Sequence, residues 1–416
     1  MRKLLVLGVC LVVLAVLVPT SPQAQNVQKI QELLAESLTA FESGLELPTL
    51  PANKPEELKA GRVRIVLEAT TVSEVRGIQA RVEALGGLVE AVYDNLVQAF
   101  VPIKSVNALA GMGSVSWVRT PFVPIWEQGN TISEGVRVIG ANLWHEAGIK
   151  GQGVKVAIVD GGFKGYQRLL GSELPPEDRV IVRSFTRDED IEADERHGTA
   201  VAEIVYDLAP EAMFYLVNFD TDVEFGNAVS FLISEGVQII NTSLGFFTGC
   251  PWEGTGLIEP IVKRARDAGI FWATSIGNSA TEHWQGIFDD PDKNGFHNFL
   301  GDDEGLTIDV DTDEVGEVIA ILGWEDKCGK ATENYELLLF DDADRRRASG
   351  SQLRAGWPSR VLVFTPRESG RYHLKIRQRT ATRPTAQLDV TVVEIEPEYV
   401  VWEGSVGIFE PAISPS

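Results

Sequence analysis

The strongest constraint on the fold is an alternation of apolar strands with helices between residues 153 and 275. The expected strands are 154–159, 213–218, 237–242 and 270–275, and the expected helices are 199–206, 225–234 and 257–268. These strands are apolar on both faces, which is typical of a parallel sheet covered by helices on both sides. The sequence therefore predicts a doubly wound α/β domain in the middle of the chain.

A smaller α+β unit is predicted before this domain. Its elements follow the order β-α-β-β-α-β, with strands at 63–67, 88–93, 95–102 and 115–118 and helices at 72–85 and 106–110. That order predicts a small split βαβ sandwich, the ferredoxin-like arrangement, over about residues 60–120. An amphipathic helix is expected at 27–41, ahead of a linker that contains three prolines.

Beyond residue 285 the strand–helix alternation gives way to short strands of period two. They are expected at 318–322, 335–340, 360–365, 372–377 and 388–393, between turns rich in Gly, Asp and Pro. Several short alternating strands with such turns predict a β-sandwich, here over residues 286–400.

The N-terminus has the pattern of a secretory signal peptide over residues 1–25. Arg2 and Lys3 precede an uncharged run at 4–18, and the small residue Ala24 stands near the end. An uncleaved anchor is the alternative, although the run is short for a membrane span. We expect a secreted protein, extracellular or periplasmic, without stable membrane insertion once the signal is cleaved.

The net charge narrows the classes of molecule that the chain could bind, and the cysteine content limits the disulfides that it could form. The net charge is −23, from 60 acidic and 37 basic side chains, which argues against nucleic-acid binding and against docking on anionic lipid. Cys10 lies within the signal peptide, so only Cys250 and Cys328 persist. They either form one disulfide or remain as two free buried thiols.

Polar residues stand where the predicted α/β strands end, at the sheet edge that carries reactive groups in such folds. Asp160 ends one strand and is followed by Gly161 and Gly162, which allow close backbone packing. His197 opens the segment HGTAVAEIV at a helix start, where the helix dipole favours a neutral imidazole able to act as a base. A hydrogen-bonded core histidine is the alternative.

Two further strand ends carry small or amide side chains. Ser243, Leu244 and Gly245 follow one strand and leave an edge on which a peptide could pair, or simply an exit into a loop. Asn278 follows another strand, where its amide could donate to an oxyanion or cap a turn.

The segments VAIVDGG, HGTAVA, INTSLG and ATSIGNS, in this order, resemble the subtilisin-like serine protease family. The resemblance implies a doubly wound α/β fold and a triad in chain order Asp, His, Ser. Asp160 would orient the histidine, His197 would act as general base and then acid, and Asn278 would stabilise the oxyanion. Ser243, Leu244 and Gly245 would line the substrate cleft. Catalysis would require no cofactor, and the implied partners are protein or peptide substrates.

The same resemblance assigns a role to each unit. Residues 26–125 would be an inhibitory propeptide, with its inhibitor unit at about 60–120, and processing would fall between 121 and 134. Residues 130–285 would be the N-terminal part of the catalytic domain, and residues 286–400 an insertion within it.

One part of the family pattern, the nucleophile, has no counterpart in this sequence. The family serine lies in a Gly-Thr-Ser-x-Ala context, and no such run occurs between residues 279 and 416. Residues 401–416, which include Ser405, would begin the return to the catalytic domain. We therefore expect a secreted serine endopeptidase precursor whose serine segment is missing from this chain, through a fragment or a truncated gene model. The alternatives are a non-catalytic secreted pseudoprotease that binds peptides or a surface, and an unfoldable remnant.

A separate motif raises the question of calcium. Asp290, Asp292, Asn294 and Gly295 form D-x-D-x-N-G, the opening of an EF-hand-type loop, but Gly301 stands where the closing Glu is needed. A structural calcium site and a plain turn are both open. The acidic run 188–195 could likewise hold a cation, select basic substrates or form a solvated loop.

Overall fold

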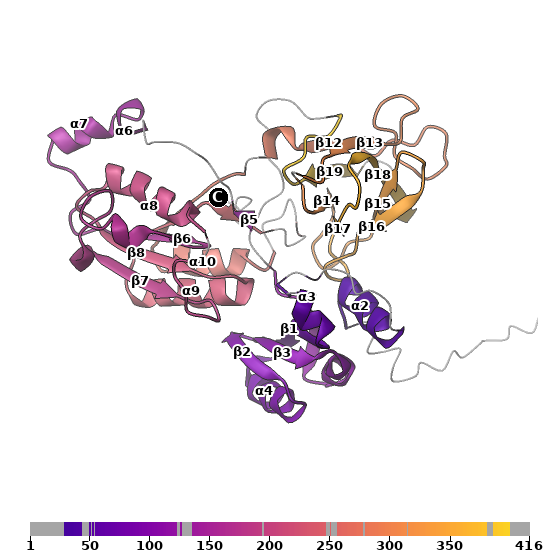
Figure 1. Cartoon of the computed structure of the whole chain (residues 1–416), viewed down its shortest axis with the longest axis horizontal. Helices are drawn as coiled ribbons and strands as arrows, with labels where there is room; N and C mark the ends of the chain where they lie inside the picture. The colour runs from indigo at the N-terminus through magenta and orange to yellow at the C-terminus, as the bar shows by residue number, and fades with distance from the viewer. Residues whose placement is uncertain are drawn as a thin grey trace, which may run out of the picture.

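The computed structural model describes residues 29–43, 50, 52–53, 55–122, 125–126, 135–193, 195–246, 250, 256–277, 279–313, 315–380 and 386–399. The predicted signal peptide, Asn278 and the final segment with Ser405 lie outside these residues, as does most of the predicted processing region. The described chain forms a small α+β unit, a parallel α/β unit and a β-sandwich (Figure 1).

The middle unit is built on a parallel five-stranded sheet in the order β11-β9-β6-β8-β7. Its strands are β6 (Lys155–Asp160), β7 (Val180–Ser184), β8 (Met213–Asn218), β9 (Ile239–Thr242) and β11 (Phe271–Thr274), and its main helices are α8 (His197–Leu208), α9 (Asp222–Ser234) and α10 (Glu259–Asp267). Two short helices, α6 (Gly135–Val138) and α7 (Ala141–Glu146), precede the sheet.

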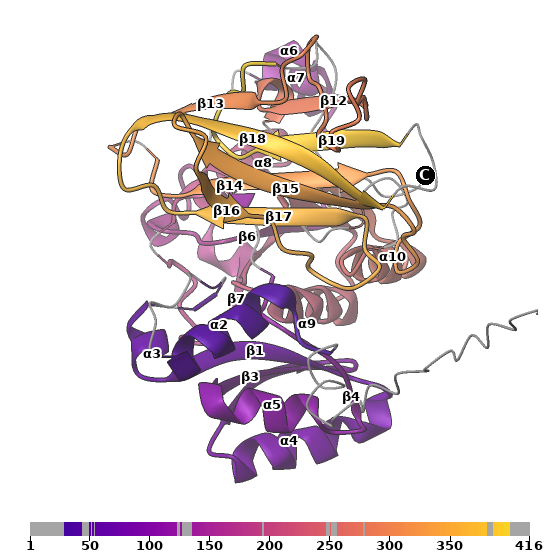
Figure 2. The same ribbon diagram turned by 90° about the vertical axis from the view of Figure 1, so that its right-hand side faces the viewer.

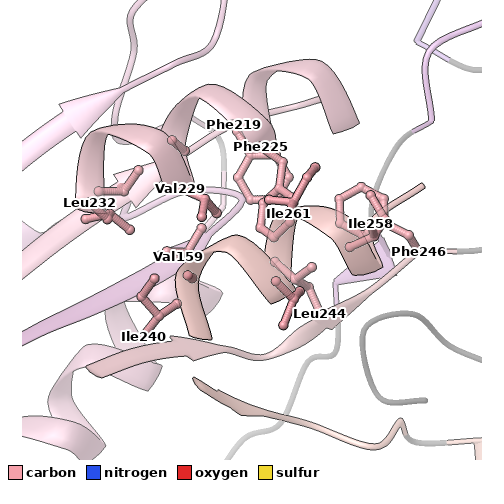
Figure 3. Packing of buried hydrophobic residues seen from close by; sticks show 14 of the residues in the cluster. Val159, Phe219, Phe225, Val229, Leu232, Ile240, Leu244, Phe246, Ile258 and Ile261 are labelled. Atoms are coloured by element: carbon pink, nitrogen blue, oxygen red, sulfur yellow. The ribbon is translucent and has the colours of Figure 1, made fainter. Parts of the chain in front are cut away.

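Alternate residues of β6 show why helices cover both faces of this sheet. Val156 and Ile158 lie in one buried cluster with Ala202 of α8. Ala157 and Val159 lie in another, with the apolar residues of α9 and α10 (Figure 3). A strand that is apolar on both faces is stable only between two such layers. The predicted doubly wound α/β class is confirmed.

The small unit carries a four-stranded antiparallel sheet in the order β2-β3-β1-β4. Its strands are β1 (Arg62–Ala69), β2 (Leu88–Tyr93), β3 (Leu96–Pro102) and β4 (Val115–Arg119), and its helices are α2 (Glu32–Ser43), α3 (Pro55–Lys59), α4 (Val75–Ala84) and α5 (Val106–Ala110), with short 3-10 turns η1 (Val72–Glu74) and η2 (Ile103–Ser105). Val63, Ile65 and Leu67 of β1 enter the core under α4 and α5. Alternation then places Val66 and Glu68, both fully buried, on the opposite face of this strand, towards the rest of the molecule.

The sandwich consists of two four-stranded antiparallel sheets, β12-β19-β14-β17 and β13-β18-β15-β16. Its strands are β12 (His283–Ile287), β13 (Leu306–Val310), β14 (Val318–Trp324), β15 (Asn334–Asp341), β16 (Arg346–Ser349), β17 (Ser359–Phe364), β18 (Gly370–Thr380) and β19 (Gln387–Val392). Trp324 and Tyr335 fill the space between the sheets. In Figure 2 the sandwich lies above the small unit, with α2 between them.

A disulfide joins Cys250 of the α/β unit to Cys328 of the sandwich, with a Cα–Cα distance of 5.5 Å. This resolves the two alternatives left by the sequence in favour of a bridge. Among the residues that the structure describes, no helix combines the length and apolar character needed to cross a membrane.

Candidate active site

Asp160 and His197 meet at the carboxyl end of the parallel sheet. Asp160 is the last residue of β6 and is fully buried, and His197 is the first residue of α8. The His197 Nδ1 atom lies 2.9 Å from each carboxylate oxygen of Asp160. An Nδ1–H donated to the carboxylate leaves Nε2 unprotonated in the neutral ring, so this pairing fixes the tautomer that a general base needs.

Two glycines allow the helix to approach the strand end so closely. A Cβ on Gly198 would come within 2.6 Å of the Gly162 carbonyl oxygen and 2.8 Å of the Asp160 Cβ. A Cβ on Gly162 would come within 2.7 Å of the Glu192 carbonyl oxygen. No side chain fits either position without displacement, so Gly162 and Gly198 are required by the geometry of the pair.

The acidic run before His197 fixes the start of α8 against the loop that follows Asp160. The Glu195 carboxylate accepts hydrogen bonds from the backbone N–H groups of Arg196 (2.8 Å) and His197 (2.9 Å), at the start of α8. Backbone bonds from Phe163 N–H to the Ile191 carbonyl and from Lys164 N–H to the Glu195 carbonyl tie the run to the loop after Asp160. A carboxylate here satisfies unpaired helix N–H groups and complements the helix dipole.

Asn218 is a buried site residue that the sequence analysis did not single out. It ends β8 in register with Asp160 and donates hydrogen bonds to the carbonyls of Asp190 (2.8 Å) and Gly161 (3.3 Å). The signal was available, because Asn218 is the polar last residue of a predicted strand, as Asp160 is. Burial raises the pKa of Asp160, while hydrogen bonds from His197 and from the Gly161 N–H act in the opposite direction.

The predicted substrate strand is paired with a segment that follows the small unit. β10 (Leu244–Gly245), directly after Ser243, pairs antiparallel with β5 (Ile125–Trp126), with Leu244 opposite Trp126 and Gly245 opposite Ile125. The Leu244 side chain is 1% exposed and points into the α/β core beside Ile261 (Figure 3). β10 therefore pairs through its backbone edge, and residues 125–126 occupy that edge in this structure.

The predicted oxyanion residue Asn278 lies outside the described residues, but its neighbour is well placed. The Ser279 hydroxyl donates to Glu282 Oε2 (3.0 Å), and the Ser279 carbonyl accepts a hydrogen bond from Nδ1 of the buried His283 (2.7 Å). His283 begins the first strand of the sandwich. Ser279 is thus attached directly to the sandwich.

The three residues proposed for calcium lie together in one turn. Asp290 accepts hydrogen bonds from the backbone N–H groups of Asn294 (3.1 Å) and Gly295 (3.0 Å), and the Asn294 amide donates to Asp292 (2.9 Å) and to Glu304. Within the parts of the chain that the structure describes, no group of three or more His, Cys, Asp or Glu side chains is arranged to hold a metal ion. These contacts are those of a turn, and calcium stays a prediction.

Comparison with known proteins assigns a family to this region. The model of the family described as "Subtilase family" matches residues 151–298. Subtilisin E of Bacillus subtilis is 27% identical over 208 residues, which cover 45% of this chain and 51% of that protein. Subtilisin J of Geobacillus stearothermophilus is 26% identical over the same shares of each chain. The chain spans about half the length of these curated relatives.

The solved structures that resemble this chain include the epidermin leader peptide processing serine protease of Staphylococcus aureus. That match has a TM-score of 0.39 and 14% identity, and it covers 53% of this chain and 61% of the other. The family match contains Asp160, His197 and β10, the strand predicted to bind substrate, so the paired residues lie within the matched segment. Over residues 151–298 this chain therefore resembles the subtilisin-like serine proteases.

Proposed function

We propose that this chain is part of the precursor of a secreted serine endopeptidase, with a propeptide held in the substrate site. The observation that carries the proposal is the Asp160–His197 pair, with His197 Nδ1 2.9 Å from both Asp160 oxygens. In this role Asp160 holds the imidazole and stabilises the imidazolium. His197 takes the proton of a serine hydroxyl and later delivers it to the leaving amine.

The reaction needs two further groups that the described residues do not supply. We assign oxyanion stabilisation to Asn278 and the nucleophile to a serine-bearing segment that completes the α/β unit. Two features support a completing segment. Within the described residues β11 pairs with β9 alone, and the buried Asn241 Oδ1 and Thr274 Oγ1 on these strands have no hydrogen-bond partner there. Buried polar atoms and strand edges of this kind are normally paired.

The precursor state rests on the pairing of β5 with β10. An extended segment that adds to an exposed strand binds through its main chain, which is how a protease site holds a peptide. Residues 125–126 lie within the interval 121–134 where processing is predicted, and they follow the small α+β unit. This supports assignment of residues 26–125 as an inhibitory propeptide that occupies the site of the protein or peptide substrate. Export by the signal peptide and a structural calcium at Asp290, Asp292 and Asn294 belong to the same proposal.

The test begins with the gene. Read past codon 416, the locus is expected to continue into a Gly-Thr-Ser-x-Ala segment. The continuous product, once processed, is expected to label with a biotinylated fluorophosphonate, which reacts with activated serines. His197→Ala should abolish the label, and His373→Ala, a change in the sandwich, should leave it intact.

A stop codon directly after 416, together with no labelling, would contradict catalysis by this protein. The pairing edge of β10 would then favour the second candidate, a secreted peptide-binding pseudoprotease. In that case peptide binding should persist and be lost when residues 243–245 are disrupted.

A further inference from the structure

A charge network joins all three units of the molecule: Glu68, Arg119 and Asp222 are buried, and the Arg354 side chain is 34% exposed. Glu68 of β1, 3% exposed, accepts hydrogen bonds from Arg119 Nε of β4 (3.0 Å) and lies 2.9 Å from Arg354 Nη1 of the sandwich. Arg119, 1% exposed, also donates through Nη2 to Asp222 Oδ2 at the start of α9 (2.7 Å). Two acids thus face two bases, one base from the small unit and one from the sandwich.

The sandwich loop that carries Arg354 is anchored in the α/β core. Leu353 and Trp357 are 7% and 4% exposed and belong to the same buried cluster as Val159 and Leu244. The Gln352 amide donates to the Trp357 carbonyl (2.6 Å), which closes the loop. The guanidinium of Arg354 is therefore presented to Glu68 from a fixed backbone, so less side-chain entropy is lost when the pair forms.

The contact between the sandwich loop and the small unit extends to Phe122, which lies between the small unit and β5. Phe122 stacks on Trp357, with ring centroids 6.5 Å apart, and the Arg119 guanidinium lies over the Phe122 ring, 4.2 Å from its centroid. The Phe122 N–H donates to Asp222 Oδ1 (3.0 Å). The sandwich loop thus packs against the last described residue before β5, the segment paired in the substrate site.

A second contact lies at α2. Glu32 in its first turn accepts hydrogen bonds from the Gln352 N–H and from Arg360 Nη1, both at 3.1 Å. The Glu32 side chain is 51% exposed, so solvent screens this pair and it contributes less than the Glu68 pair. Both contacts place acids of the small unit against bases of the sandwich segment 352–360.

We propose that the sandwich segment 352–360 is a second docking surface for the propeptide, which it retains through Glu68 and Glu32 after the chain is cut between the units. The inference rests on the proposed function in one respect, that residues 26–125 are the propeptide. The sandwich then determines how long the cut propeptide remains in the substrate site. Its partner is the acidic face of this small unit, formed by one buried and one half-exposed glutamate.

The experiment uses the full 416-residue chain with a recognition site for a sequence-specific protease placed within residues 127–134. After cutting, release of the N-terminal fragment is followed by size-exclusion chromatography at successive times after dilution. The fragment should stay bound in the otherwise unchanged chain. Arg354→Gln should speed release by about tenfold or more, since it leaves a buried carboxylate without one partner. Arg360→Gln should speed it by a few-fold at most.

Two controls separate docking from folding. Arg354→Lys keeps the charge facing Glu68 and should release the fragment more slowly than Arg354→Gln does. Arg371→Gln removes an exposed arginine of the same sandwich, paired with Asp309, and should leave the release rate unchanged. If Arg354→Gln, Arg360→Gln and the double variant all release the fragment at the unchanged rate, the second docking surface is overturned.

The readout requires no nucleophile, so it is independent of the proposed activity. Release that depends on Arg354 in a protein that never labels with fluorophosphonate would contradict the protease function and leave the docking surface standing. If the continuous product labels with fluorophosphonate and the release rate does not depend on Arg354, the protease function stands and the second docking surface is contradicted.

Discussion

His197 Nδ1 lies 2.9 Å from both carboxylate oxygens of Asp160, so one buried carboxylate determines which imidazole nitrogen carries the proton. Asp160→Asn keeps the size of the side chain but allows the amide to donate to Nδ1, which selects the wrong tautomer. In the continuous, processed enzyme we expect kcat to fall by about 10⁴-fold, with KM little changed. The measurement is steady-state hydrolysis of a chromogenic peptide, with Asp207→Asn, at the far end of α8, as control. Near-normal kcat in Asp160→Asn would contradict the assigned role.

Gly198 determines how closely α8 approaches the strand end. In Gly198→Ala the new methyl group would meet the Gly162 carbonyl oxygen at 2.6 Å and the Phe163 ring at 2.9 Å, contacts that the backbone must shift to relieve. We expect a loss of about 1–3 kcal/mol in the free energy of unfolding, measured by denaturant titration of the full chain. Gly77→Ala is the matched control, since Gly77 lies in α4 with nothing within 4 Å of its added Cβ. That change should be neutral or stabilising.

Glu224 should make stability depend on pH in an unusual direction for a carboxylate. Burial raises its pKa to about 7, and Gln98, Thr221, the Asp220 backbone and Arg64 surround it. Between the unfolded value of 4.5 and about 7 the folded state binds more protons than the unfolded state, so stability falls as pH rises. The stabilising contribution of neutral Glu224 is complete below pH 4.5 and is lost as the pH rises past about 7.

The measurement is the difference in Tm between Glu224→Gln and the unchanged chain, taken at intervals from pH 5 to pH 8. The difference should grow in favour of Glu224→Gln across this range, because glutamine stays neutral. A constant difference would show that Glu224 does not titrate in this window. Glu83→Gln, a change at an exposed carboxylate on α4, serves as control.

The sequence alone predicts the elements whose apolar residues follow a clear helical or strand pattern. β8 was predicted with its observed bounds, because all of its central residues are buried between helices. Asp160 and His197 were predicted together because each stands at the end of a strongly patterned element. β7, by contrast, was missed, since it is an edge strand whose residues are half-buried or exposed, without a clear period.

The remaining features depend on pairs of residues that only the folded chain brings together. Nothing local marks Glu195 as a helix cap within a run of acids, or Glu68 as the partner of Arg354. The pairing of β5 with β10 likewise joins segments with little pattern of their own, two residues on each side. Such contacts arise from the docking of units that are far apart in the sequence, and amphipathic periodicity carries no information about that docking.

The Cys250–Cys328 bridge should hold the sandwich against the α/β unit. It closes a loop with a sequence separation of 78 residues and ends beside the core that contains Trp357 and Leu353. Because a long loop is constrained in the unfolded chain, Cys250→Ser with Cys328→Ser should cost about 2–4 kcal/mol in the free energy of unfolding. Denaturant titration of the full chain, with and without a reductant, measures this. Reductant should destabilise the unchanged chain and leave the double variant unaffected. Equal stability of the unchanged chain and the double variant without reductant would contradict a stabilising bridge.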